Sequence, residues 1–316
     1  MMSRTVDPEA EQASGQSRRR SLRVAAVQAT PVFLDRAATL EVVATEVAKA
    51  GADGADLVVF PESFVPCYPD WVWRRLPMSD ADWWLRFCDQ AVDTYGPDLD
   101  RVREAAEAAG AWVALGVTER LNSGTLNNSV VYIDPTGAIA ARHRKLIPTG
   151  AERMIWGNGH HNLLTIVSID GVRVGSLICW EMYMPLARVA MYERGIDVLL
   201  APTWDNSDEW VPTLRHVAKE GQVFVVGVSA CLRGSDVPRG LSGADDIYGG
   251  DDDWMSKGNT TIVAPGGEVL SGPLIGEPGT VSADLELDRI TVGRRMFDPV
   301  GHYARPDVFQ LTVTRF

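Results

Sequence analysis

Short apolar runs alternate along the chain with segments of helical periodicity, which is the pattern of an α/β protein. Runs rich in Val, Ile and Leu predict strands, and apolar residues three or four positions apart predict helices. The predicted strands are residues 22–28, 56–60, 112–118, 129–133, 162–168, 172–178, 198–201, 223–230, 260–264 and 280–284. The predicted helices are residues 36–50, 82–95, 98–109, 183–194, 213–220 and 285–292. This interleaving predicts helices packed on the faces of sheets.

The same pattern predicts one domain after a short tail. Residues 1–20 end in three arginines and contain almost no large apolar side chain, so we expect a disordered tail. The arginines resemble the start of an export signal, but the segment that follows fits a first strand better. No Pro/Ser-rich linker interrupts residues 21–316, which predicts a single domain. Residues 233–254 hold five Gly and six Asp without periodicity, and we expect a long surface loop there, over a site.

Composition narrows the classes of function. Of 316 residues, 46% are hydrophobic and 23% charged, as in ordinary globular proteins. The net charge of −12 disfavours binding to nucleic acid and to anionic membranes, and no apolar run approaches the roughly 18 residues of a membrane span. The cysteines Cys67, Cys88, Cys179 and Cys231 are spaced too irregularly for a disulfide framework or a zinc site, which predicts a reducing, cytoplasmic location.

Several common nucleotide-binding, metal-binding and serine-nucleophile motifs are missing from the sequence. It lacks a phosphate-binding Gly-Lys-Ser/Thr loop, a dinucleotide glycine pattern, His-Glu-x-x-His and Gly-x-Ser-x-Gly. The acidic run 251–253 has no ligand spacing around it and is interpreted as a solvated turn rather than a cation site. We therefore expect neither an organic cofactor nor a metal.

Three reactive side chains follow apolar runs, where α/β proteins commonly build their sites. Glu62 follows the predicted strand 56–60, Lys145 ends a strand-like pattern, and Cys179 stands where the strand 172–178 gives way to a helix. Taken singly, Glu62 could cap a helix, Lys145 could be a solvated surface cation, and Cys179 could be an inert buried thiol. The helix N-terminus would favour the thiolate and lower the pKa of Cys179 from about 8.5.

Together these residues fit nucleophilic catalysis. A thiol nucleophile needs a base to accept its proton, and it needs a cation or hydrogen-bond donor to stabilise charge on the substrate. Glu62, Lys145 and Cys179 would supply the three parts, in that order along the chain.

With these residues, the chain resembles the nitrilase, or carbon–nitrogen hydrolase, superfamily from about residue 22 to its C-terminus. The segments that carry the resemblance are Val24-Ala25-Ala26-Val27-Gln28-Ala29, Phe60-Pro61-Glu62, His143-Arg144-Lys145, Pro148-Thr149-x-x-Glu152-Arg153-x-x-Trp156-Gly157, Cys179-Trp180-Glu181 and Gly301-His302-Tyr303-x-Arg305-Pro306-Asp307. Cys-Trp-Glu followed by Met-Pro is similar to the nitrilase branch rather than to amidases or carbamoyl hydrolases.

The resemblance implies a four-layer αββα sandwich, a homo-oligomer that is a dimer or larger and often spiral, and no metal or organic cofactor. It implies hydrolysis of a nitrile to a carboxylic acid and ammonia through a thioimidate and a thioester on Cys179. Glu62 would be the base, while Lys145 and the backbone N–H of Trp180 would stabilise the developing charge. Glu152 resembles the family's second glutamate, which positions the lysine or the water, and Glu181 is interpreted as structural. The apolar segment 301–316 would serve subunit association.

The substrate pocket is harder to predict. Tyr68 and Trp71 follow Glu62, Trp180 adjoins the nucleophile, and Thr203 and Trp204 follow the strand 198–201. We expect Tyr68, Trp180, Thr203 and Trp204 to contact the substrate in an aromatic-lined pocket. The sequence departs from the usual nitrilase pattern at Cys67, which could line the pocket, and at His160-His161.

Several alternatives stay open on sequence grounds. The same residues could serve an amidase or a carbamoyl hydrolase, or an enzyme that degrades cyanide or small nitriles. The fold could also form a binding subunit without catalysis. A papain-like Cys-His hydrolase would use His216 or His302.

Overall fold

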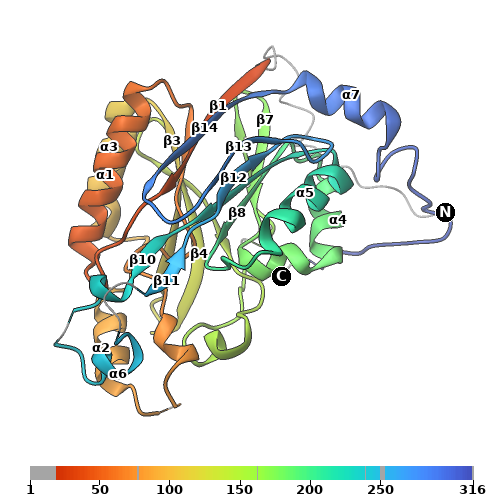
Figure 1. The fold of residues 1–316 in the computed structure, drawn as a ribbon. Helices are drawn as coiled ribbons and strands as arrows, with labels where there is room; N and C mark the ends of the chain where they lie inside the picture. The colour runs from red at the N-terminus through yellow and green to blue at the C-terminus, as the bar shows by residue number, and fades with distance from the viewer. Residues whose placement is uncertain (1–18, 77, 162, 239, 250–252, 315–316) are drawn as a thin grey trace.

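Two six-stranded sheets packed face to face form the centre of the molecule (Figure 1). The computed structural model describes residues 19–314 except 77, 162, 239 and 250–252, so nearly all of the expected tail lies outside the described residues. The first sheet has the order β14-β1-β2-β3-β4-β5, with β1 Ser21–Gln28, β2 Leu57–Val59, β3 Trp112–Arg120, β4 Leu126–Ile133, β5 Ile139–Arg144 and β14 Gly279–Glu286. The second has the order β13-β12-β9-β8-β7-β6, with β6 Ile166–Ile169, β7 Val172–Ser176, β8 Val198–Thr203, β9 Phe224–Ser229, β12 Thr260–Val263 and β13 Val269–Leu274.

Helices cover the outer faces of both sheets, which completes the expected αββα sandwich (Figure 1). On the first sheet lie α1 (Arg36–Ala52) and α3 (Asp100–Ala109), and on the second lie α4 (Pro185–Glu193) and α5 (Trp210–Gly221). The helices α2 (Ala81–Gln90) and α6 (Ala244–Ile247) lie together at one end of the sandwich, near the short pair β10 (Cys231–Arg233) and β11 (Trp254–Lys257) (Figure 1). The last helix, α7, spans Asp288–Met296. No helix in the described part of the chain is both long and apolar enough to cross a membrane.

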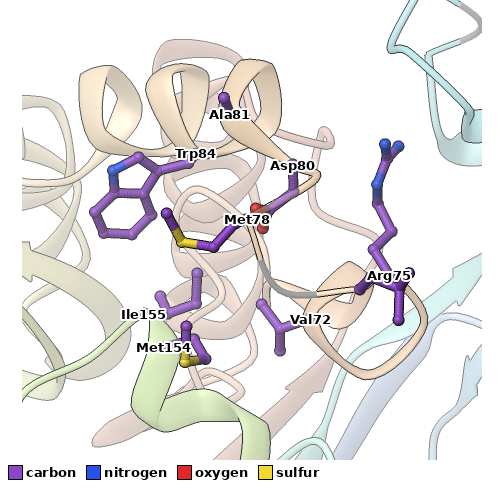
Figure 2. A pocket seen from close by; sticks show the side chains of 9 residues that line it. Val72, Arg75, Met78, Asp80, Ala81, Trp84, Met154 and Ile155 are labelled. Carbon is purple, nitrogen blue, oxygen red and sulfur yellow. The ribbon is translucent and has the colours of Figure 1, made fainter.

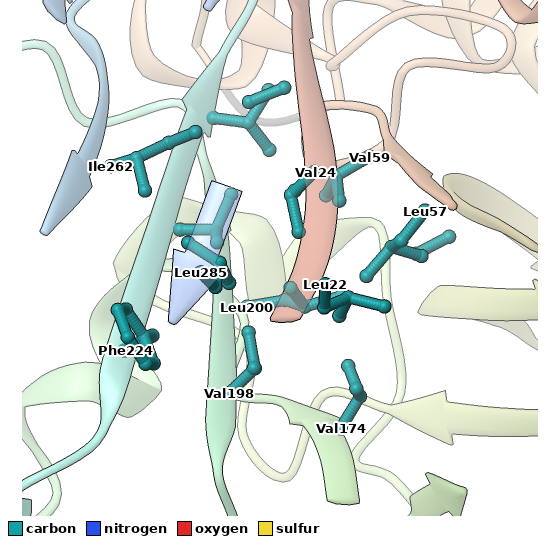
Figure 3. Close-up of a cluster of buried hydrophobic side chains, with 14 of the residues drawn as sticks. Leu22, Val24, Leu57, Val59, Val174, Val198, Leu200, Phe224, Ile262 and Leu285 are labelled. Atoms are coloured by element: carbon teal, nitrogen blue, oxygen red, sulfur yellow. The ribbon is translucent and has the colours of Figure 1, made fainter. Parts of the chain in front are cut away.

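Successive side chains of a strand point to opposite faces of the sheet, so the nearly continuous apolar runs of the central strands bury both faces. In β1, Leu22 and Val24 face the second sheet, whereas Ala25 and Val27 face α1 and α3. Leu22 and Val24 belong to the same buried cluster as side chains of the second sheet, such as Leu200 of β8 (Figure 3). Both faces of the central strands are therefore apolar, whereas the edge strands β13 and β14 are more exposed.

The structure corrects several expected elements. The helix predicted over 82–95 ends at Gln90. Beyond that end, Val92 lies beside β3, and its backbone N–H donates to the carbonyl oxygen of Thr118 at 2.8 Å. Four strands were missed: the short strands β10 and β11, and β13 and most of β5, whose apolar positions are interrupted by polar residues or by Gly and Pro. The segment 233–254 is not all loop, because it contains α6 and the first residue of β11, and it begins at the last residue of β10.

Candidate active site

Three strand ends bring Glu62, Lys145 and Cys179 together between the sheets. Glu62 follows β2 by three residues, Lys145 directly follows β5, and Cys179 begins the 3-10 helix η5 (Cys179–Tyr183) shortly after β7. Glu152 comes from another 3-10 helix, η4 (Gly150–Met154). The four side chains are between 1% and 5% exposed, so the strand order gathers polar groups in a buried place.

A close backbone approach places Glu62. The segment after β2 crosses β3 at Gly116, where a Cβ atom would lie 1.9 Å from the carbonyl oxygen of Pro61. Only glycine permits that crossing. The crossing delivers the carboxylate of Glu62 to the space between the two sheets.

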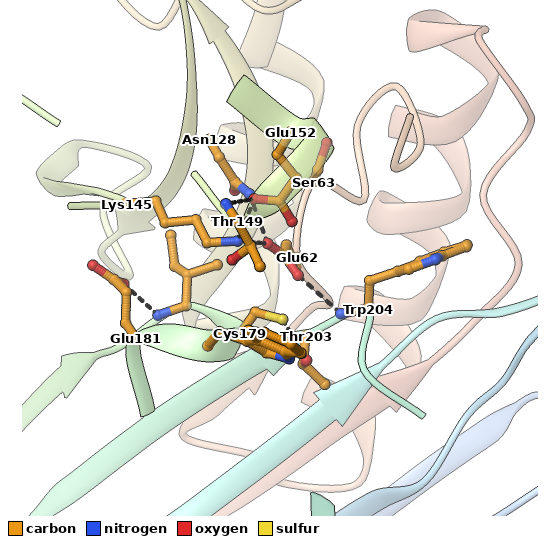
Figure 4. A network of polar contacts seen from close by, with 12 residues as sticks. Glu62, Ser63, Asn128, Lys145, Thr149, Glu152, Cys179, Glu181, Thr203 and Trp204 are labelled. Atoms are coloured by element: carbon orange, nitrogen blue, oxygen red, sulfur yellow. Dashed lines mark hydrogen bonds and ion pairs between the residues drawn. The ribbon is translucent and has the colours of Figure 1, made fainter. Parts of the chain in front are cut away.

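Lys145 is enclosed by two carboxylates (Figure 4). Its Nζ donates to Oε1 of Glu62 at 2.7 Å and to Oε2 of Glu152 at 2.8 Å. Glu62 also accepts from the side-chain amide of Asn128 at 2.7 Å and from the backbone N–H of Trp204 at 2.9 Å. Every donor that reaches Glu62 stabilises its ionised form and fixes its orientation.

The charges in this network set the protonation states. Burial raises the pKa of Glu62 above its ordinary value, although the Lys145 ammonium opposes the shift. Burial alone would lower the pKa of Lys145, but the carboxyl groups of Glu62 and Glu152 raise it. Lys145 therefore stays a cation, and one positive charge faces two buried carboxylates.

The thiol of Cys179 is protonated in the resting site, which corrects the expectation from the helix N-terminus. Burial, followed by the charge of Glu62, raises its pKa well above the ordinary value, against the opposing effect of Lys145. The single turn η5 contributes too little dipole to overcome desolvation. Cys179 has a left-handed φ of 53°, which is uncommon for a residue with a side chain and is often found at functional sites.

Cys179 opens into a cavity of about 800 Å³. Tyr68, Trp180 and Trp204 line this cavity, whereas Thr203 contacts the sulfur, with Oγ1 donating to Sγ at 3.1 Å. The described lining residues are Tyr68, Asp70, Trp73, Thr149, Glu152, Cys179, Trp180, Tyr183, Trp204, Asp205, Asn206, Ser207, Glu209 and Met255. Volume and lining suit a small organic molecule held against aromatic side chains.

Other expected pocket residues lie elsewhere. Cys67 and Trp71 are fully buried in the cluster around α2 and are absent from the described cavity wall. His160 and His161 are exposed, and the carbonyl oxygen of His160 accepts from Arg144 at 3.2 Å. These two departures from the family pattern therefore do not shape the cavity.

A rigid aromatic wall faces the thiol. The rings of Tyr68 and Trp204 stack with centroids 4.7 Å apart. The hydroxyl of Tyr68 donates to Glu152 at 2.7 Å and accepts from the indole of Trp73 at 3.0 Å. Tyr68 thus connects the cavity wall directly to the carboxylate that holds Lys145.

Sequence reasoning missed Asp70, Trp73 and Asn128. Asp70 is 5% exposed, accepts from the Trp204 indole at 3.2 Å and forms an ion pair with Arg74. Neither Asp70 nor Asn128 belongs to a short motif, and only the fold brings them to the site. The one available signal was the aromatic richness of residues 71–84, which contains Trp73.

Glu181 joins the two halves of the site. Its Oε1 accepts from the backbone N–H of Leu146 at 2.7 Å, and its Oε2 accepts from Ile178 N–H at 2.5 Å and contacts His143 Nε2 at 2.9 Å. Leu146 follows Lys145 and Ile178 precedes Cys179, so one carboxylate holds both segments. This geometry fits the structural role expected for Glu181.

No histidine belongs to the described wall of the cavity. His216 is exposed on α5, with Nε2 lying 3.4 Å from Glu220, and His302 is exposed near the C-terminus. Neither histidine of the papain-like alternative therefore belongs to the described wall of the cavity into which Cys179 opens. Within the described ranges, no group of three or more His, Cys, Asp and Glu side chains could hold a metal ion; residues 251 and 252 of the acidic run lie outside those ranges.

A second hollow of about 230 Å³ lies beside α2 and η4, lined mainly by apolar side chains such as Trp84, Met78 and Met154 (Figure 2). Its ionisable lining residues are Asp80, which accepts from the Trp71 indole at 3.1 Å, and Arg75, which donates to the Ser79 carbonyl at 2.7 Å. Neither is arranged as a base or nucleophile, so this hollow is not a catalytic site.

Comparisons with known proteins agree with the geometry. A family model described as carbon–nitrogen hydrolase matches residues 23–295. An aliphatic nitrilase of Sinorhizobium fredii (strain HH103) is 40% identical over 300 residues, covering 92% of this chain and 95% of the relative. A bifunctional nitrilase/nitrile hydratase of Nicotiana tabacum is 36% identical over 303 residues, covering 93% of this chain and 86% of the relative.

The fold also matches solved structures. Nit3 of Saccharomyces cerevisiae, a member of branch 10 of the nitrilase superfamily, superposes with a TM-score of 0.72 at 18% identity, covering 90% of this chain and 97% of that one. At this identity the likeness establishes the architecture alone.

Proposed function

The chain belongs to the carbon–nitrogen hydrolase family and is a hydrolase acting on carbon–nitrogen bonds, and from this membership we propose that it is a nitrilase converting an organic nitrile to a carboxylic acid and ammonia. The observation that carries the proposal is the buried Lys145 ammonium, which is held by Glu62 and by Glu152, a residue that lines the same cavity as Cys179. The named nitrilases among the relatives favour a nitrile over an amide as substrate.

In the first step Glu62 accepts the proton of the Cys179 thiol, and the sulfur attacks the nitrile carbon. A carbon–sulfur bond forms as one π bond of the C≡N group breaks, and negative charge develops on the nitrogen. Lys145 and the backbone N–H of Trp180 stabilise that charge. The proton held by Glu62 then passes to the nitrogen, which gives a neutral thioimidate.

Two waters complete the turnover. The first, activated by Glu62 or Glu152, adds to the thioimidate carbon. The carbon–nitrogen bond then breaks, ammonia leaves, and a thioester remains on Cys179. The second water adds to the thioester, releases the carboxylic acid and returns the proton to sulfur. Glu152 positions Lys145 throughout, because its Oε2 binds the ammonium while its Oε1 accepts from Tyr68.

Product analysis tests this proposal. Purified protein is incubated with aliphatic, aryl and arylacetonitriles and with the matching amides, while acid, amide and ammonia are quantified. We expect acid and ammonia from nitriles, and no turnover by Cys179→Ala. Hydrolysis of amides alone would assign the protein to the amidases, and preference for cyanide would assign it to the small-nitrile degrading enzymes. Turnover that survives Cys179→Ala would contradict the assigned nucleophile.

We also propose that the protein is a cytoplasmic homo-oligomer in which the segment 301–316 contributes to subunit association. All four cysteines are free, which suits a reducing compartment. Val308, Phe309 and Val313 are between 51% and 75% exposed, which suits burial against another copy.

A further inference from the structure

The hydroxyl of Thr203 is set against the nucleophilic sulfur by the topology of the second sheet. Thr203 is the last residue of β8, which runs parallel to β7, the strand that leads into Cys179. Carboxyl ends of neighbouring parallel strands lie at one edge of a sheet. Thr203 is fully buried there, and its Oγ1 lies 3.1 Å from Sγ.

A second hydrogen bond orients this hydroxyl. The backbone N–H of Asp205 donates to Oγ1 of Thr203 at 2.9 Å. A backbone N–H can only donate, so it occupies a lone pair of the hydroxyl oxygen and leaves the hydroxyl proton for another partner. The sulfur of Cys179 lies in position to accept that proton.

Most of the other donors around the thiol already have partners. Glu62 and Glu152 accept two of the three N–H groups of Lys145, and the proposed mechanism directs the third toward the substrate nitrogen. Asn128 and the Trp204 backbone donate to Glu62. Within the described structure, Thr203 supplies the hydrogen bond to Sγ. Two nearby carboxyl groups disfavour a thiolate, and a hydrogen bond donated to the sulfur stabilises it.

We propose that Thr203 is a positioning residue that holds Sγ of Cys179 toward the cavity and donates its hydroxyl proton to the thiolate as Glu62 removes the thiol proton. The hydrogen bond is strongest while the sulfur is charged and weakens once the carbon–sulfur bond forms. Thr203 thus favours thiolate formation without stabilising the covalent adduct, a role different from substrate contact. The inference rests on the proposed function in taking Cys179 as the nucleophile.

Alkylation of Cys179 by iodoacetamide across pH tests this role without a nitrile. The variants are Thr203→Val, which keeps the shape, Thr203→Ala as a second change that removes the hydroxyl, and Thr203→Ser, which keeps it. Because Cys67, Cys88 and Cys231 are also free, alkylation is followed on the peptide that contains Cys179. Losing a hydrogen bond to a charged group should slow alkylation about tenfold at neutral pH and shift the profile to higher pH.

The expected pattern is slow alkylation by the Val and Ala variants and recovery of most of the rate by the Ser variant. The kcat/KM for nitrile should fall by a similar factor, mainly through kcat. An unchanged pH profile in a folded Val or Ala variant would overturn the inference, as would equal losses in the Ser and Val variants. Failure of the wild-type protein to hydrolyse nitriles would instead contradict the proposed function, since alkylation reports on Thr203 independently.

Discussion

Nζ of Lys145 lies 2.7 Å from Oε1 of Glu62, and both side chains are at most 1% exposed. Glu152 is a second acidic partner of the same ammonium, so one buried cation is shared by two carboxyl groups. This arrangement predicts unequal losses of stability when the cation or one of the carboxyl groups is removed.

Lys145→Met should destabilise the protein strongly, because it leaves two buried carboxylates without a cation. Loss of one member of a buried ion pair costs about 3–5 kcal/mol, and we expect that decrease in the free energy of unfolding at neutral pH. Glu62→Gln leaves Lys145 balanced by Glu152 but removes one of two acceptor oxygens, so one buried donor loses its partner and the cost should be about 1–3 kcal/mol, less than for Lys145→Met. Urea denaturation measures both values, and equal destabilisation by the two variants would contradict the charge count. Both variants should be inactive.

The pH dependence of kcat/KM should have an acidic limb above pH 4.5, the ordinary pKa of a glutamic acid. Burial raises the pKa of Glu62, and Glu62 must be ionised to accept the thiol proton, so activity falls as pH drops through that raised pKa. Lys145, whose pKa is raised above 10.5, should cause no loss of activity below that pH.

Asn128→Leu should move the same acidic limb to still higher pH. The Asn128 hydrogen bond favours ionised Glu62 and lowers its pKa, so removing it raises the pKa further. The pH–rate profile of the variant is compared with wild type after circular dichroism shows that it folds. A shift toward lower pH would contradict the assignment of Glu62 as the base.

Glu181→Gln should lower stability and activity together. A glutamine has one acceptor oxygen, whereas Glu181 accepts backbone N–H groups from both Leu146 and Ile178. One buried N–H then loses its partner, which costs about 1–3 kcal/mol in thermal or urea denaturation. Because those groups flank Lys145 and Cys179, kcat should also fall. Glu193→Gln, an exposed site on α4, is the matched control and should change neither property.

The cavity should discriminate against anionic nitriles. Asp205 and Glu209 line it without an ion pair in the described structure, and its described wall contains no basic side chain. A neutral nitrile should therefore have a higher kcat/KM than a carboxylate-bearing nitrile of equal length, and added salt should reduce the difference. Glu209→Gln should reduce it as well, whereas Asp288→Asn on distant α7 should not. Equal turnover of both nitriles at low salt would contradict this prediction.

Truncation after Tyr303 should lower the mass of the assembly. It removes Val308 and Phe309, which are 56% and 75% exposed, together with Leu311, which packs on the core beneath α4 and α5. Light scattering measures the mass, and Phe309→Ser tests the apolar contact without shortening the chain. An unchanged mass in both variants would exclude this segment from the interface.

The sequence predicts Glu62 and Cys179 close to strand ends because continuous apolar runs precede them, although the predicted strands extend one and two residues beyond the observed ends at Val59 and Ser176. Lys145 was predicted to end a strand-like pattern, although most of β5 was missed. The αββα sandwich required the family resemblance, since alternation of strands and helices is common to many α/β folds.

Long-range contacts could not be predicted. The hydrogen bond from Trp204 to Glu62 joins residues 142 positions apart, and no local pattern encodes it. The pKa of Cys179 was expected to fall because its helical position is visible in the sequence, whereas its burial and the nearness of Glu62 are properties of the fold. The end of α2 was missed for a related reason, because pairing of Val92 beside β3 overrides helical propensity.

The antiparallel pairing of β1 with β14 joins Ser21–Gln28 to Gly279–Glu286 across nearly the whole chain. During synthesis, the edge of β1 that pairs with β14 therefore stays without its partner until residues 279–286 have left the ribosome. An exposed strand edge is a template for pairing with other chains. The nascent protein thus depends for most of its synthesis on protection of that edge, and a ribosome that stalls before β14 would release a product prone to aggregate.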